Sequence, residues 1–278
     1  MKQLIINADD FGISHAVNKA ILDCFVFGSI DSATLMVNMP CVEEAVGMSV
    51  NFQLPVGLHF NITLGRPISD ACKVKSLINE NGKFYSRREF IKRYFLNRIS
   101  TQEIGVEFFA QIEKFMSYGL HLDHIDSHQH IHVLPNIFDR LASYCVKNSV
   151  PLRVLKQGRV RSSGINKYIR MAIIQKLNSR NEKKWSNQLS SNDYLTSVFD
   201  FIPKNGEVSF DLYKSCIESL KQGVSELMVH PISNARDEEK NLTRISSISQ
   251  IEYDVLISTQ FKQLLKQEEI KRYGFSML

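Results

Sequence analysis

The chain has 278 residues, of which 44% are hydrophobic and 23% are charged, and its formal net charge is +5. This composition is typical of a globular protein and excludes a largely disordered chain. No apolar run reaches the roughly 18 residues of a membrane-spanning helix. We therefore expect no membrane span, and a single domain over residues 1–278.

The cysteines and the N-terminus favour a cytoplasmic location. The five cysteines are far apart and form no C-x-x-C pair, so neither a disulfide framework nor a cysteine-based zinc site is expected. Only three apolar residues follow Lys2 before the polar Asn7, which is too short for the apolar core of a signal peptide.

In the first half of the chain, short apolar runs alternate with amphipathic segments. Strand patterns occur at 2–8, 32–37, 56–63 and 121–130. Helical patterns begin near Ser14 and end at Gly28, follow Pro40, and cover 87–97, 101–118 and 136–147. A long connection with a turn at 81–82 precedes the third of these helices.

The same alternation continues in the second half. Strand patterns occur at 151–156, 194–199, 226–229 and 273–277, and helical patterns at 165–177, 210–222 and 250–266. Alternating strands and helices predict an α/β fold with a parallel sheet. Seven or eight such units suit a (β/α) barrel, with an open doubly wound sheet as the alternative. No G-x-G-x-x-G follows a strand, so dinucleotide binding is not predicted.

Positive charge is concentrated between residues 153 and 184, which hold ten Lys/Arg and one acidic residue. Such a stretch is able to bind nucleic acid or another anion. Apolar residues at helical spacing separate the charges over 165–177. We therefore favour a solvated helix face, and expect no nucleic-acid partner.

Polar residues gather where the predicted strands end, which is where parallel sheets and barrels carry their active sites. Asp9 and Asp10 follow the first strand. Other polar residues lie near the ends of the later strands or directly after them: His59, Asn61, Asp126, His128, His130, His132, Arg153 and His230. Two adjacent carboxylates repel each other unless a cation joins them. If one aspartate is a metal ligand and the other is free to act as a base, the cation offsets the repulsion between the two carboxylates.

The segment Asp-Ser-His-Gln-His-Ile-His at 126–132 is the strongest single motif. If it stays extended, His128, His130 and His132 point the same way as Asp126. Either all three imidazoles bind a metal, or one is the ligand and the others lie behind it or in the substrate cleft.

Two histidines and one carboxylate with an open position are typical of a hydrolytic metal centre. Such a centre also needs a base for the water and an acid for the leaving group. The second aspartate suits the first task and His230 the second. No G-x-S-x-G elbow, Walker A loop or H-E-x-x-H helix is present.

Five motifs in order, NADDFG at 7–12, GLHFNIT at 57–63, DSHQHIH at 126–132, PLRV at 151–154 and ELMVHP at 226–231, resemble the YdjC-like carbohydrate deacetylases. The connecting pieces GRPIS at 65–69 and SLINENGKF at 76–84 are also similar to that family, and the resemblance extends to about residue 235.

The resemblance implies an irregular (β/α) TIM-like barrel related to polysaccharide deacetylases, with one divalent metal ion per chain. By motif position, Asp10, His59 and His128 correspond to its ligands, Asp9 to the catalytic base and His230 to the catalytic acid. Arg153 resembles a neighbour that orients a carboxylate or the substrate. Imidazole ligands favour Zn²⁺, whereas the family is often described with Mg²⁺, so both remain candidates.

The implied substrates are small N-acetylated amino-sugar oligosaccharides, cleaved to an amine and acetate. Asn61, Asp126, His130 and His132 are expected to contact substrate or support the ligands. Three alternatives remain: a metal-dependent hydrolase of another amide or of a lipid-linked sugar, a barrel that keeps its metal for stability alone, and a non-catalytic protein that binds nucleic acid through 153–184. A homodimer is a further expectation from barrel relatives.

Overall fold

The computed structural model describes residues 1–156, 165–185, 187–200, 208–234, 246–268 and 270–278. Its strands are β1 (Lys2–Phe11), β2 (Ser32–Leu35), β3 (Val56–Phe60), β4 (Leu122–Ser127), β5 (Tyr194–Thr196), β6 (Gly223–Val229) and β7 (Lys271–Arg272). Its helices are α1 (His15–Phe27), α2 (Val42–Phe52), α3 (Arg87–Phe95), α4 (Thr101–Ser117), α5 (Pro135–Asn148), α6 (Ile165–Trp185), α7 (Phe210–Glu218), α8 (Ser246–Leu256) and α9 (Thr259–Gln267).

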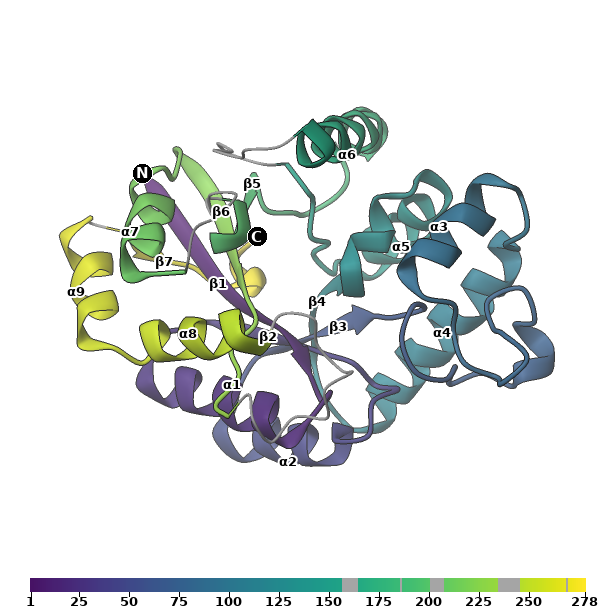
Figure 1. Cartoon of the computed structure of the whole chain (residues 1–278), viewed down its shortest axis with the longest axis horizontal. Coiled ribbons are helices and arrows are strands. Elements are labelled where there is room, and N and C mark those ends of the chain that lie inside the picture. The colour runs from purple at the N-terminus through teal and green to yellow at the C-terminus, as the bar shows by residue number, and fades with distance from the viewer. Residues whose placement is uncertain (157–164, 186, 201–207, 235–245, 269) are drawn as a thin grey trace.

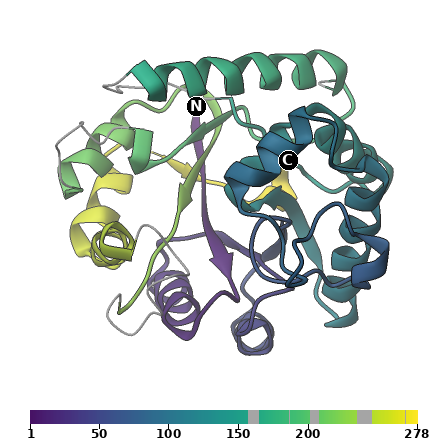
Figure 2. The same ribbon diagram turned by 45° about the vertical axis from the view of Figure 1, so that its right-hand side comes forward.

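The strands form one parallel sheet in the order β4-β3-β2-β1-β6-β5, and β7 pairs with β1 away from this path. The sheet curls into a half-barrel with helices around it, and α6 lies across the top of the view in Figure 2. The predicted α/β barrel class is confirmed.

Residues 151–156 connect the two edges of the curled sheet. Leu152 forms a parallel bridge with Ile125 of β4, and the Arg153 amide donates to the Ile125 carbonyl at 3.0 Å. At the other edge, the Leu195 amide of β5 donates to the Lys156 carbonyl at 2.7 Å. This segment was predicted as a strand, but it forms an isolated bridge and scattered backbone hydrogen bonds instead of a continuous ladder, and these bring Arg153 inside the curl.

Alternation along the strands separates two faces, because successive side chains of a strand point opposite ways. In β1, Leu4, Ile6 and Ala8 belong to the large apolar core under the helices. Ile5 points inward and packs with Val224 and Phe275. The next inward residues, Asn7 and Asp9, begin a polar interior toward the carboxyl ends of the strands.

Local signals explain where several helices begin and end. The Ser14 hydroxyl accepts a hydrogen bond from the Val17 amide at the start of α1, and Gly28 ends that helix at φ 81. The predicted helix at 250–266 is in fact two helices, because Ser258 caps a new one by accepting from the Phe261 amide.

Other predicted boundaries were displaced. β1 extends to Phe11 and contains both aspartates, whereas β3, β4 and β5 end earlier than predicted. The strand predicted at 273–277 is instead β7 at Lys271–Arg272, followed by a 3₁₀ turn at Phe275–Met277. Among the described residues, no helix is long and apolar enough to cross a membrane.

The basic side chains that the structure describes between residues 153 and 184 lie in different surroundings. Arg153 is buried inside the sheet. Lys156 pairs with Glu182, and Lys184 pairs with Asp139 at 2.9 Å. Within α6, Asn178 accepts from the Leu155 amide and Asn181 donates to the Val133 carbonyl. Buried amides therefore hold the second half of this helix to the 151–156 segment and to the turn after β4, while the Arg180 and Lys184 side chains are exposed.

Candidate metal centre and its buried charge network

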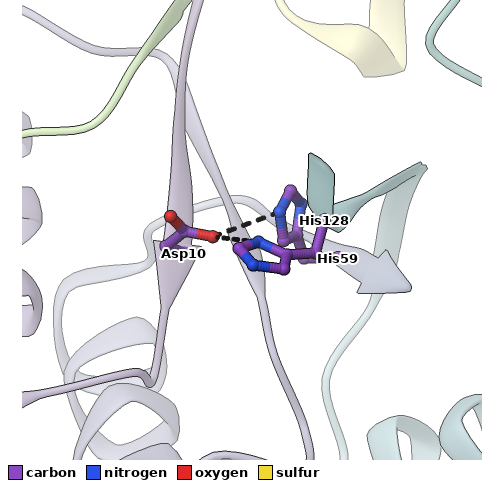
Figure 3. Close-up of side chains that lie close together, drawn as sticks. All are labelled: Asp10, His59 and His128. Carbon is purple, nitrogen blue, oxygen red and sulfur yellow. Dashed lines mark hydrogen bonds and ion pairs between the residues drawn. The ribbon is translucent and has the colours of Figure 1, made fainter. Parts of the chain in front are cut away.

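Asp10, His59 and His128 meet at the carboxyl ends of β1, β3 and β4 (Figure 3). Asp10 Oδ1 lies 2.9 Å from His128 Nδ1 and 3.3 Å from His59 Nε2. The two imidazole rings meet edge to face, with centroids 5.5 Å apart. The structure thus brings together three residues that lie far apart in the chain.

The backbone at Asp10 and after His128 departs from regular strand geometry. Asp10 has φ 68, and the pairing of β1 with β2 shifts register between Ala8 and Phe11. Left-handed backbone is costly for a non-glycine residue and is common at functional sites. Here it turns Asp10 toward the two histidines.

Asp126 fixes the orientation of His59. Asp126 Oδ1 accepts from His59 Nδ1 at 2.7 Å, which leaves Nε2 facing Asp10. Burial alone lowers the pKa of His59, but the surrounding carboxylates, chiefly Asp126, outweigh it and raise the pKa to about 10. A carboxylate behind an imidazole is a common arrangement at metal sites, where it sets the tautomer of the ligand.

Arg153 lies at the centre of a second group of buried side chains. Its guanidinium makes a two-pronged pair with Asp9, at 2.7 and 2.8 Å. It also contacts Asp126 at 2.6 Å and, through Nε, Glu226 at 2.8 Å. Burial raises the pKa of Asp9, but the guanidinium outweighs it and holds that pKa well below its ordinary value.

His230 lies beside Asp9, directly after β6. Its Nε2 is 3.8 Å from Asp9 Oδ2. β1 and β6 pair in register from Lys2↔Gly223 to Ala8↔Val229, so Asp9 and His230, the next residue of each chain segment, lie at the same level. This register explains why Asp9 and His230 meet although 221 positions separate them.

His132 has a structural role that the motif did not indicate. The Arg153 carbonyl accepts from His132 Nε2 at 3.1 Å, and a carbonyl only accepts, so Nε2 carries the proton. Nδ1 then accepts from the Ser127 hydroxyl. Burial lowers the pKa of His132 to about 4. Both nitrogens of this neutral ring are occupied in holding the turn and the Arg153 segment.

The segment after Ser127 does not stay extended, so the three motif histidines do not share a face. β4 ends at Ser127, and residues 128–133 form a 3₁₀ turn interrupted by left-handed backbone at Gln129 and His130. Only His128 reaches Asp10. His130 Nδ1 is buried and has no hydrogen-bond partner among the described residues.

Asn61 shapes a loop beyond β3. Its amide donates to Asn38 and to the Leu64 carbonyl, and its oxygen accepts from the amides of Thr63 and Leu64. All of these bonds lie within or beside the turn after β3, so Asn61 positions that loop rather than the three-residue group.

Two members of the network escaped prediction from the sequence. Glu226 lies in the middle of β6, and Thr34 in β2 bonds to Asp9, His59 and Asp126. Each is a polar residue inside an otherwise buried strand. That pattern was visible in the sequence and signals an inward-facing network when partners are present.

The residues around Asp10 fit a divalent cation. Two imidazole nitrogens and a carboxylate oxygen lie within 4.8 Å of one another, and they match the donors that zinc and other transition metals prefer. Asp9, Asp126 and Glu226 converge on the single guanidinium of Arg153, and Asp10 adds a fourth carboxylate beside the two histidines. A doubly charged ion would offset the excess of carboxyl groups.

Comparison with known proteins gives the same family along nearly the whole chain. The family described as YdjC-like protein matches residues 3–267. A carbohydrate deacetylase from Geobacillus stearothermophilus is 43% identical over 156 residues, which are 56% of this chain and 60% of that protein. A chitooligosaccharide deacetylase from Yersinia pestis strain Pestoides F is 37% identical over 155 residues, 55% of this chain and 59% of that protein.

The matches to these two relatives thus span about 60% of their length. In three dimensions, the chain is similar to a proposed cellobiose-phosphate cleavage protein from Enterococcus faecalis V583. The TM-score is 0.79 at 24% sequence identity, covering 99% of this chain and 97% of that one. This likeness shows the fold.

Proposed function

This chain belongs to the YdjC-like protein family, and from that premise we propose that it is a metal-dependent deacetylase. The proposed reaction removes the N-acetyl group from small N-acetylated amino-sugar oligosaccharides. The names of the relatives from Geobacillus and Yersinia support this class of substrate. Hydrolysis of another amide, or of a lipid-linked sugar, would use the same residues and is distinguished by the substrate tests below.

One observation carries the proposal: a three-donor group and an acid–base pair lie at the same end of the sheet. Asp10, His59 and His128 would hold the ion, with Zn²⁺ and Mg²⁺ as the candidates. When bound, such an ion supplies Lewis-acid polarisation of the acetamide carbonyl and activation of water.

Asp9 is the proposed base. Its carboxylate is ionised because Arg153 holds it by two hydrogen bonds, and the same bonds fix its orientation. Asp9 accepts the proton of the attacking water, and a fixed carboxylate reduces the reorganisation that this step requires.

His230 is the proposed acid, which protonates the departing sugar nitrogen. Its Nε2 lies 3.8 Å from Asp9 Oδ2, so acid and base border the same space. This proximity suits a reaction in which one proton leaves the water and another reaches the nitrogen of the same tetrahedral species.

We expect His128→Ala to lose metal and activity together. Removing a ligand should weaken metal affinity by more than about 100-fold, the upper range for residues that only support ligands. Isothermal titration with Zn²⁺ measures the affinity, and His121→Ala, which alters an exposed histidine outside the site, is the control. Unchanged affinity in His128→Ala would point to His130 as the ligand, since both nitrogens of His132 are occupied.

The function itself is tested by acetate release from N,N′-diacetylchitobiose, using metal-loaded protein. We expect one acetate and one free amine for each bond cleaved. If the protein binds one metal but releases no acetate from this sugar, other acetamido sugars and simple amides are the next substrates. If it binds no metal under any condition, the hydrolase proposal fails.

A further inference from the structure

Glu252 is a fully buried carboxylate that meets His230 from a different part of the chain. It lies on α8, at the inward positions shared by Ser249, Val255 and Leu256. Its Oε2 accepts from the His230 amide at 2.5 Å, and its Oε1 accepts from the Tyr213 hydroxyl at 2.6 Å. Figure 1 shows α8 alongside β1 and β6.

Both oxygens of Glu252 accept hydrogen bonds, which is the pattern of an ionised carboxylate. A buried charge of this kind is costly unless a positive group is near. Among the described residues, Glu252 forms no ion pair with a lysine or an arginine. Burial raises the pKa of Glu252 above its ordinary value, and the nearby His230 is the largest influence in the opposite direction.

The groups in contact with His230 come from three other parts of the chain. Asp9 of β1 lies 3.8 Å from the imidazole Nε2, the Phe199 ring lies edge to face with the imidazole at 5.7 Å, and Glu252 of α8 accepts from the backbone amide. His230 Nδ1 is buried and has no hydrogen-bond partner among the described residues. His230 therefore meets two carboxylates, Asp9 at its imidazole and Glu252 at its backbone amide, and Asp9 has Arg153 as its own partner.

We propose that Glu252 is a positioning residue for His230: its hydrogen bond fixes the start of the loop after β6, and its negative charge favours the protonated imidazole. This inference rests on the proposed function. Arg153 neutralises Asp9, whereas no such cation neutralises Glu252 among the described residues.

A purely structural role is the competing explanation. Glu252 ties α7, through Tyr213, to the end of β6, and losing that connection would loosen the site whatever the charge. The two explanations differ in what they predict for substitutions that remove the charge and for substitutions that keep it.

The test uses metal-loaded full-length protein and three variants. Glu252→Gln removes the charge at nearly constant size, Glu252→Asp keeps it, and Tyr213→Phe removes one hydrogen bond but leaves the charge. The His230 imidazole is followed by ¹⁵N NMR across pH, and kcat and kcat/KM for N,N′-diacetylchitobiose are measured over the same range. Far-UV circular dichroism and thermal unfolding show whether each variant is folded.

In Glu252→Gln, we expect the midpoint of the His230 titration to fall by about one pH unit. The alkaline limb of the kcat profile should move to lower pH by the same amount. At pH values on the alkaline side of that limb, kcat should therefore be about tenfold lower than in the wild type, with KM little changed. In Glu252→Asp, which keeps the charge, the midpoint should stay close to that of the wild type. In Tyr213→Phe it should differ from the wild-type midpoint by less than about 0.3 units.

An unchanged midpoint in folded Glu252→Gln overturns the proposal, and so does an equal shift in Tyr213→Phe. If the wild type releases no acetate from any amide tested, the proposed function fails instead. The NMR titration still decides the role of Glu252 in that case, because it requires no turnover.

Discussion

Asp9→Asn is expected to lower kcat for acetate release by about 10²–10⁴-fold, the usual contribution of a general base. Asparagine has nearly the same size and can still accept a hydrogen bond from Arg153, so the surrounding side chains stay in place. It has no oxygen able to take a proton at neutral pH. Because Asp9 pairs with Arg153 and His230 and is not one of the three proposed ligands, metal content should be unchanged.

The measurement is a steady-state assay of acetate together with metal analysis of the purified variant. Asp31→Asn is the matched control, since Asp31 also pairs with an arginine, Arg272, at 2.9 Å but lies outside the site. The control should keep kcat within about twofold. Wild-type turnover in Asp9→Asn would remove Asp9 as the base, and loss of metal would mean that it is a ligand.

Arg153→Met should reduce the free energy of unfolding by about 3–5 kcal/mol, as removing one partner of a buried ion pair usually does. The guanidinium is fully buried and contacts Asp9, Asp126 and Glu226. Because methionine replaces much of the aliphatic part of the arginine side chain, the loss of unfolding free energy arises mainly from the carboxylates that are left without a cation. Activity should fall as well, because Asp9 loses its anchor.

Urea unfolding monitored by circular dichroism measures this change, provided that the m-value stays constant. Arg153→Lys keeps a charge but lacks the planar fork, and should recover only part of the stability. Arg272→Met tests a partly exposed pair with Asp31 and should cost about 1 kcal/mol or less. If Arg153→Met lowers the free energy of unfolding by less than Arg272→Met does, the buried carboxylates do not depend on Arg153 for stability.

The element types were largely readable from the sequence because their signals are local. Ser14 and Gly28 define α1 through hydrogen bonds within a few residues. Apolar runs separated by amphipathic helices predict a parallel sheet whatever the exact pairing. In such a sheet the carboxyl ends lie together, so the polar residues at these ends were predictable as one group, whereas the choice of Asp10, His59 and His128 within it came from the resemblance to the family.

The turn after Ser127 was harder to predict. Alternation along a strand predicted that His128, His130 and His132 share a face, but backbone at φ 55 and φ 58 ends that alternation. Nothing within the motif distinguishes a ligand from a histidine that bonds to a distant carbonyl. The positions of Ser127 and of the Arg153 segment decide this for His132.

By itself, then, the sequence determined the alternation of strands and helices, the family, and the residue types collected at the strand ends. Only the tertiary structure decided that Arg153 is a buried partner of three carboxylates, that Glu226 and Thr34 face the same interior, and that Glu252 reaches His230 from α8. The physical reason is that helix caps and strand alternation arise between near neighbours in the chain. Whether a buried charge is tolerated depends instead on partners that strand register and helix packing bring from far away.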